Sequence, residues 1–303
     1  MTKRDKTKNN HNHHHHHHTV VKSLNKAFKL GIALNIAYVL VEAVFGIYYD
    51  SMGLLSDAGH KLSDVATLAI AMFAFKMAQH PTSERYTYGY QKMTIQASLV
   101  NAVLLLIAVG AILVESISKL IHPEAVDGSA IAWVAGIGIV VNGVTAWLFM
   151  REKDKDLNVK GAFLHMAADA LTCIGVVVSG IIIHLTGWYI IDPIIGICIA
   201  CIVGWSAISL LRDSMRLSLD AVPEGIDYEQ IKEAIEKVQG VITVRSLHIW
   251  ALSTTATAMT TQVVVDKPDD IDMAINNIRQ KTHQMGIDHS TIEALPQPNY
   301  ASE

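Results

Sequence analysis

The sequence predicts an all-α membrane domain, a bundle of six transmembrane helices, followed by a small α+β domain. Six apolar runs, each long enough for the roughly 20 residues of a bilayer-spanning helix, lie between residues 24 and 211. Beyond Leu211 the composition becomes that of a soluble domain, with helical and strand-like patterns in turn. We therefore expect four regions: a tail at 1–23, a transmembrane domain at 24–211, an α+β domain at 212–296 and a tail at 297–303.

The first 23 residues are polar, rich in Lys and Asn, and contain a histidine run from His13 to His18. They lack the short apolar core and small-residue cleavage site of a signal peptide. A histidine run can bind metal, but six consecutive histidines are also the pattern of an affinity tag. The sequence leaves both interpretations open, and we expect a disordered His-rich tail in either case.

The apolar runs predict six spans, and several of them contain the glycines and small residues typical of packed membrane helices. The predicted spans are 26–49, 52–78, 93–121, 129–150, 160–185 and 189–211. Lys and Arg gather before the first span and in the second-to-third and fourth-to-fifth connections. The positive-inside rule places those segments, and both termini, in the cytoplasm. We therefore expect an integral membrane protein.

The last part of the chain alternates between helical and strand patterns. An amphipathic helix from Tyr228 to Gln239 precedes two strands, at 241–252 and 257–265. A second helix, capped by Asp269 and ending at Met285, precedes a short strand at 290–295. The resulting order, α-β-β-α-β, predicts a small open sheet with two helices on one face.

Ionisable residues interrupt the second apolar run. Asp57, His60, Lys61 and Asp64 lie in it, although charged groups are costly at the depth of a bilayer and usually mark function. On a helix, residues four apart face the same side, so His60 and Asp64 lie one above the other. Asp57, seven residues before Asp64, falls near the same face. Lys61 lies about 100° round the helix from His60, and we do not expect it to be a ligand.

The same spacing recurs in the fifth run, at His165 and Asp169. Two such helices packed together would present two imidazoles and two carboxylates to one point. His and Asp ligands suit zinc, with cadmium, cobalt or nickel as alternatives. Because such ligands must be deprotonated to hold a metal, binding releases protons. The simpler alternative is two buried His–Asp hydrogen bonds that hold helices together.

Other polar residues lie within the predicted spans. Glu42, Asn35, Asn101 and Asn142 would either line a wet cavity leading to the site or hydrogen-bond between helices. For the three asparagines we favour interhelical hydrogen bonds. Glu42 and Asp57 are the candidates for supporting positions around the ligands.

At these residues the sequence resembles the cation diffusion facilitators, in their zinc-type branch. The resemblance covers nearly all of residues 28–295, and its matching segments are Leu55–His60 with Asp64, Tyr88–Tyr90, Gly161–Asp169 and Leu247–Trp250. It implies export of divalent metal from the cytoplasm in exchange for protons, with a zinc preference. The implied transport site is His60, Asp64, His165 and Asp169. It also implies a cytoplasmic metallochaperone-like domain that forms homodimers.

The resemblance carries over to other positions unevenly. Some relatives bind a second metal in the second-to-third loop, but Tyr86 and Tyr90 stand at the matching positions here. In the C-terminal domain His248 matches a family ligand, whereas Gln262 does not. His289 and Glu293 are the nearby substitutes, and we do not expect a complete site there. Lys92 and Asp220 match an ion pair between the two domains.

Three other function classes compete with metal export. An intramembrane zinc hydrolase is disfavoured because the chain has no His-Glu-x-x-His motif. A membrane metal sensor would need a signalling module, which the sequence does not show. A primary pump is disfavoured by the lack of a Gly-x-x-x-x-Gly-Lys-Ser/Thr motif. The net charge of −4 argues against nucleic acid as a partner, and we expect neither enzymatic activity nor an organic cofactor.

Overall fold

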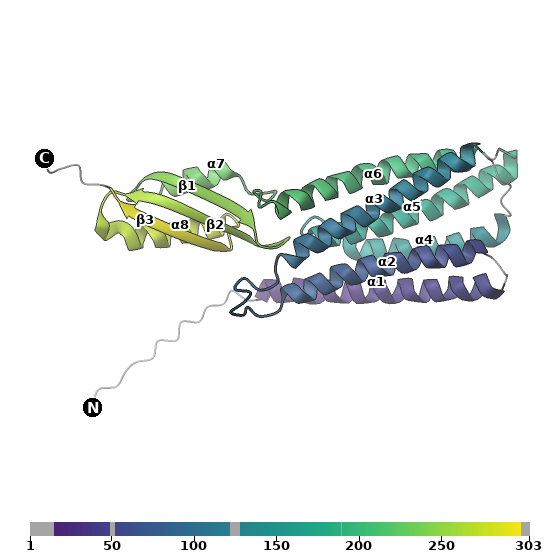
Figure 1. Cartoon of the computed structure of the whole chain (residues 1–303), viewed down its shortest axis with the longest axis horizontal. Helices are drawn as coiled ribbons and strands as arrows, with labels where there is room; N and C mark the ends of the chain where they lie inside the picture. The colour runs from purple at the N-terminus through teal and green to yellow at the C-terminus, as the bar shows by residue number, and fades with distance from the viewer. Residues whose placement is uncertain (1–14, 49–51, 122–127, 189, 298–303) are drawn as a thin grey trace, which may run out of the picture.

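The computed structural model describes residues 15–48, 52–121, 128–188 and 190–297, with only the backbone at several positions inside helices. In this described part six long helices come first. They are α1 (His15–Tyr48), α2 (Met52–Ala78), α3 (Met93–Ile121), α4 (Gly128–Met150), α5 (Leu157–Thr186) and α6 (Ile191–Ser218). The helices run side by side, and the α+β domain lies beyond one end of the bundle (Figure 1).

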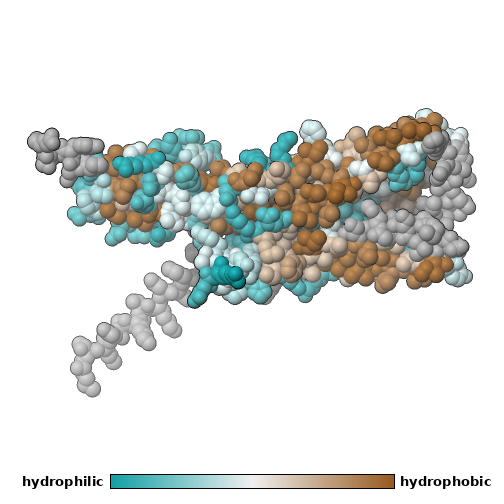
Figure 2. Space-filling view, in the orientation of Figure 1, coloured by the Kyte–Doolittle hydropathy of each residue, from teal (hydrophilic) through white to brown (hydrophobic). Residues whose placement is uncertain are grey.

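The helical domain has the surface of a membrane protein. Apolar residues cover much of the visible face of the bundle, whereas the α+β domain is mixed (Figure 2). Ile107, Trp147 and Trp205 are 63%, 64% and 82% exposed, which would be unfavourable in water over so large an area. In the described residues four helical segments are long and apolar enough to cross a bilayer: Lys26–Phe45, Met93–Ile121, Leu157–Ile183 and Ile191–Ser218. The predicted membrane-embedded helical domain is confirmed.

Two helix ends differ from the predicted spans. Helix α1 begins at His15, inside the segment expected to be a tail, because no glycine or proline interrupts the chain between His15 and Leu30. Helix α6 continues past Leu211 to Ser218. Its polar end is held by other helices, since Asp213 Oδ2 lies 2.9 Å from Lys160 Nζ and Ser214 Oγ 2.8 Å from Ser98 Oγ. The expected boundary at 211/212 therefore falls inside a continuous helix.

Helix α5 is shared by the two packed cores of the membrane domain. One core joins α5 to α1, α2 and α4 around Phe28, Phe149 and Met166. The other joins α5 to α3 and α6 around Leu105, Ala168 and Val203. Close helix contact depends on glycine: a Cβ at Gly175 of α5 would lie 2.8 Å from Ile199 Cδ1 and 2.9 Å from Ile195 Cγ2 on α6. A movement of α5 must therefore disturb both cores.

The C-terminal domain has the predicted order of elements. It consists of α7 (Tyr228–Glu236), β1 (Val241–Ala251), β2 (Thr257–Val265), the 3₁₀ turn η1 (Pro268–Asp270), α8 (Ile271–Gln284) and β3 (His289–Pro296). Strand β2 is central, antiparallel to β1 and parallel to β3. Both helices cover one face of the sheet, where Ile235 and Ile278 meet Met259 and Val263 in one core.

The predicted cap at Asp269 is wrong. Asp269 lies within η1, and the residue that precedes α8 is Asp270, whose side chain makes no capping hydrogen bond. Pro268 explains the difference, because proline favours the first position of a helical turn and starts the short 3₁₀ segment earlier than expected.

Candidate metal centre

Helices α2 and α5 bring two carboxylates and one imidazole together inside the bundle. One ligand atom each from Asp64, His165 and Asp169 lies within 4.8 Å of the other two. His165 Nε2 lies 2.7 Å from Asp64 Oδ1, at hydrogen-bond distance, and 3.9 Å from Asp169 Oδ2. In the described part of the chain this is the one such group of three His, Cys, Asp or Glu residues.

The three side chains are largely hidden from solvent and lipid. Their exposed fractions are 1% for Asp64, 6% for His165 and 13% for Asp169. Each position follows from local helix geometry, since His165 and Asp169 lie one turn apart on α5 and Asp64 comes from the facing α2. Buried carboxylates are costly unless they are paired or coordinate a cation. The donor set suits a divalent metal such as zinc.

A buried cation stands beside this group. Lys61 lies one helical turn before Asp64 on α2 and is only 5% exposed. Its ammonium lies 5.6 Å from the centre of the Tyr38 ring on α1, a cation–π distance. This contact holds the Lys61 ammonium against α1, while its backbone lies one turn from Asp64.

The structure describes the other candidate residues of the membrane domain only in part. The side chains of His60 and Asp57 lie outside the described part, although position 60 is one turn before Asp64 on α2. Glu42 is fully buried on α1. Asn35 Nδ2 donates to Gly31 O at 2.9 Å and contacts Met166 Sδ on α5 at 3.6 Å. Asn101 and Asn142 are buried without a hydrogen-bond partner among the described residues.

Comparison with known proteins identifies the family. Residues 28–217 match the cation efflux transmembrane domain, and residues 223–291 match the cation efflux protein cytoplasmic domain. The chain belongs to the cation efflux family. The resemblance to the cation diffusion facilitators is therefore confirmed, and the α+β segment is the cytoplasmic domain of this cation efflux protein.

Its curated relatives are named as metal transporters. The cadmium, cobalt and zinc/H⁺–K⁺ antiporter of Bacillus subtilis is 32% identical over 88% of either chain. The metal cation efflux system protein CzcD of Cupriavidus metallidurans is 32% identical over 82% of this chain and 79% of its own. The zinc transporter ZitB of Escherichia coli is 33% identical over 90% of this chain and 89% of its own.

In the cytoplasmic domain of this cation efflux protein the candidate ligands are not gathered into one group. His248 is exposed on β1, across from Thr260 of β2. His289 begins β3, with its ring edge-on to Tyr88 at a centroid distance of 6.3 Å. Glu293 Oε2 accepts a 2.7 Å hydrogen bond from Gln262 Nε2, which occupies one carboxylate oxygen.

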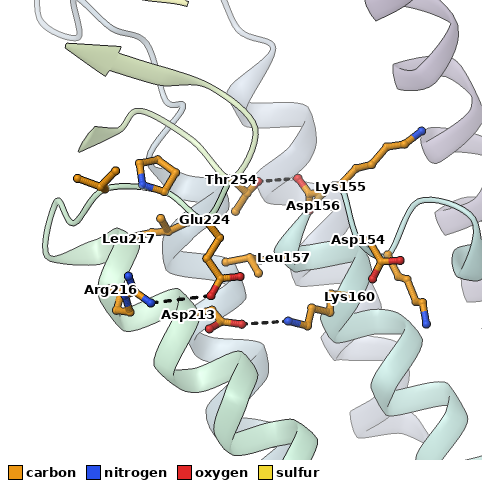
Figure 3. A pocket seen from close by; sticks show the side chains of 13 residues that line it. Asp154, Lys155, Asp156, Leu157, Lys160, Asp213, Arg216, Leu217, Glu224 and Thr254 are labelled. Carbon is orange, nitrogen blue, oxygen red and sulfur yellow. Dashed lines mark hydrogen bonds and ion pairs between the residues drawn. The ribbon is translucent and has the colours of Figure 1, made fainter. Parts of the chain in front are cut away.

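The two domains of the cation efflux protein meet through polar contacts. Lys92 Nζ, just before α3, lies 2.7 Å from Asp220 Oδ1, just after α6. Asp220 adopts a φ of 58°, a left-handed conformation that aspartate tolerates better than most residues. Close by, Lys160–Asp213 and Arg216–Glu224 line a cavity at the same junction (Figure 3).

Two residues in the described structure escaped the sequence reasoning. The angle between Lys61 and His60 on the helix argues against Lys61 as a ligand, but its three-residue spacing from Asp64 predicts that the two side chains are neighbours. Thr254, in the turn between β1 and β2, contacts both α3 and α5. Its only signal is a short Ser-Thr-Thr sequence, which is common in turns.

Proposed function

We propose that this cation efflux protein is a secondary transporter that moves zinc out of the cytoplasm in exchange for protons, and not an enzyme. The observation that carries the proposal is the buried group of Asp64, His165 and Asp169 on two facing helices. We propose His60, one turn before Asp64, as its fourth ligand. Four ligands on two helices can open to either side of a membrane if the helices move, which a closed structural site cannot do.

The short distance in the centre supports exchange with protons. A proton shared by His165 Nε2 and Asp64 Oδ1 accounts for their separation of 2.7 Å. Two atoms that ligate the same tetrahedral zinc at ordinary bond lengths stand about 3.4 Å apart. Zinc and that proton therefore compete for the same pair of atoms, so zinc binding releases protons and weakens as the pH falls. The name of the Bacillus relative, a zinc/H⁺–K⁺ antiporter, points to the same chemistry.

The proposal includes a topology. In this topology all six long helices span a bacterial cytoplasmic membrane: the four with clear apolar spans, and α2 and α4 in addition. Both termini then lie in the cytoplasm. The proposed membrane domain runs to the end of α6 at Ser218, and the proposed cytoplasmic domain follows it to residue 296. Two copies form a homodimer through the cytoplasmic domain. The Lys92–Asp220 pair links the domains.

Zinc is the proposed main substrate, with cadmium and cobalt as secondary ones and nickel as a further candidate. Imidazole and carboxylate donors suit zinc, and the names of the relatives include zinc, cadmium and cobalt. His60→Asp would replace a nitrogen donor by a harder oxygen donor and is expected to weaken the discrimination between zinc and cadmium. The ratio of zinc flux to cadmium flux, compared between the variant and the wild type, measures this discrimination. An unchanged ratio would remove His60 from the proposed ligand set.

Transport into proteoliposomes tests the function directly. With the cytoplasmic face outward, zinc should accumulate when the interior is acidic and should leak out when that gradient is reversed. Asp169→Asn, which keeps the side-chain shape but removes the charge, should abolish accumulation. Zinc uptake that ignores the proton gradient would exclude antiport, and no uptake by the wild type would exclude the transporter.

A further inference from the structure

The turn between β1 and β2, residues 252–256, contacts the cytoplasmic ends of two membrane helices. The backbone N–H of Thr254 donates to Thr94 Oγ1 in the first turn of α3, at 3.1 Å. The Thr254 hydroxyl donates to Asp156 Oδ2, just before α5, at 2.5 Å. Figure 3 shows this second bond at the edge of the junction cavity. One residue of the cytoplasmic domain thus holds two helices that are far apart in sequence.

The turn presents Thr254 in a fixed position. The buried Ser253 hydroxyl accepts hydrogen bonds from the backbone N–H groups of Thr255 and Ala256, at 3.1 and 2.9 Å. The backbone N–H of Leu252 donates to Ala256 O at 2.8 Å and closes the loop. Because β1 and β2 leave this turn directly for the core of the cytoplasmic domain, Thr254 moves with that domain.

The groups that Thr254 holds are themselves structural elements of the membrane domain. Asp156 is the N-cap of α5, since its Oδ1 accepts from the backbone N–H groups of Asn158 and Val159 at 2.7 and 3.1 Å. Asn158 Nδ2 donates to Thr94 O at 2.9 Å and joins α5 to α3. Asp156 thus uses one carboxylate oxygen for the start of α5 and the other for the cytoplasmic domain.

We propose that Thr254 is a positioning residue that couples the cytoplasmic domain to the metal centre through α5. His165 and Asp169 lie roughly 13 and 20 Å along α5 from Asp156, at 1.5 Å per residue. A helix transmits a displacement of its end as a rigid element, and α5 belongs to both cores of the membrane domain. The inference rests on the proposed function, because it takes the centre on α5 as the transport site.

A purely stabilising contact would behave differently. A cavity of about 330 Å³ lies beside the bond and is lined by Lys160, Arg216 and Glu224 as well as by Asp156 and Thr254. Water can enter such a polar space and replace the lost hydroxyl at Asp156 Oδ2. Removal of the Thr254 hydroxyl is therefore expected to leave the unfolding temperature nearly unchanged while it uncouples the two domains.

The test compares Thr254→Val, which keeps the shape and removes the hydroxyl, with two controls. Thr254→Ser keeps a hydroxyl, and Thr255→Val changes the adjacent threonine, whose hydroxyl contacts only Ser253 among the described residues, at 3.3 Å. Hydrogen exchange of the full-length protein is measured with and without zinc. In the wild type, zinc should slow exchange in the 252–256 turn. Thr254→Val should lose at least about two thirds of this response, and both controls should keep it.

Zinc flux gives the second readout. Thr254→Val should lower maximal flux and should raise half-saturating zinc by about fivefold, the low end of known coupling between sites, because zinc and the Thr254 contact strengthen each other. The two controls should transport like the wild type. Wild-type zinc flux that fails altogether would overturn the proposed function, whereas equal flux and equal zinc-dependent exchange in Thr254→Val and wild type would overturn the coupling alone. The coupling would also be overturned if Thr254→Val lowered the unfolding temperature but kept the zinc-dependent exchange response, because the contact would then only stabilise the fold.

Discussion

Each charged group of the candidate metal centre has a distinct proposed role that a single substitution can separate. In the proposed site Asp64 and Asp169 supply the negative charge and His165 supplies a nitrogen donor, while the buried Lys61 lies one helical turn from Asp64. Burial strengthens every one of these interactions, because the screening of bulk water is missing. Small changes in side-chain charge should therefore produce large changes in metal affinity.

Neutralising either carboxylate should remove most zinc binding. Asp64→Asn and Asp169→Asn each keep the side-chain volume and take away one ligand charge, so we expect zinc affinity to fall by at least about tenfold. Titration calorimetry of the purified protein measures the affinity. Asp154→Asn, an exposed carboxylate shortly before α5, is the matched control. Zinc binding at wild-type strength in both buried variants would remove the assigned centre.

Removing the buried cation should have the opposite effect. Lys61→Met keeps a long apolar side chain but deletes the charge that repels a divalent ion, so zinc should bind about tenfold more tightly. Release should then limit transport, and maximal flux should fall while affinity rises. Lys61→Arg, which keeps the charge, should preserve wild-type affinity. A Met variant that binds zinc no better than the wild type would show that the Lys61 charge does not reach the centre.

At the scale of elements, close contact between helices α5 and α6 of the membrane domain depends on glycine. Gly175→Ala would place a methyl group 2.8 and 2.9 Å from two isoleucines of α6, so we expect a loss of about 1–3 kcal/mol in unfolding free energy. Gly180→Ala, on the same helix with nothing within 4 Å, should be neutral or slightly stabilising. Thermal unfolding in detergent compares the two variants, and equal melting temperatures would contradict tight α5–α6 packing.

The sequence predicted helices and strands well where hydrophobic pattern decides them. Spans 52–78 and 93–121 coincide with α2 and α3, and strand 257–265 coincides with β2. The sequence-based prediction was wrong at helix ends that depend on tertiary contacts. One example is the polar end of α6, which hydrogen-bonds to Ser98 and Lys160. A charged segment after an apolar run looks like a domain boundary, and only the folded neighbours show that the helix continues.

The candidate site was also predictable only in part from the sequence. The repeated His-x-x-x-Asp spacing pointed to α2 and α5, from which the structure gathers Asp64, His165 and Asp169. Spacing along one helix cannot show which residues a second helix will cover, so the burial of Lys61 against Tyr38 was not foreseen. Thr254 lies beyond any local pattern, because its partners are 98 and 160 residues away in the sequence.

At the scale of the whole molecule, the cytoplasmic domain has a core of its own. Ile235, Ile278, Met259 and Val263 are almost fully buried within it, without help from the membrane domain. Residues 220–297 are therefore expected to fold alone as a soluble α+β domain. Circular dichroism should show a cooperative thermal transition, and light scattering should show a dimer. A fragment that lacks any cooperative transition would mean that the membrane helices are needed for folding.

The Thr254 contact also orders events during synthesis. The ribosome makes Asp64, His165 and Asp169 before it reaches Thr254, which follows Asp169 by 85 residues. At ordinary translation rates of about 5–20 residues per second, that delay is roughly 4–17 seconds. During this interval the nascent chain already carries the three residues of the candidate metal centre but lacks its cytoplasmic attachment. Newly made membrane helices therefore remain without control from the cytoplasmic domain until the β1–β2 turn has left the ribosome and docked.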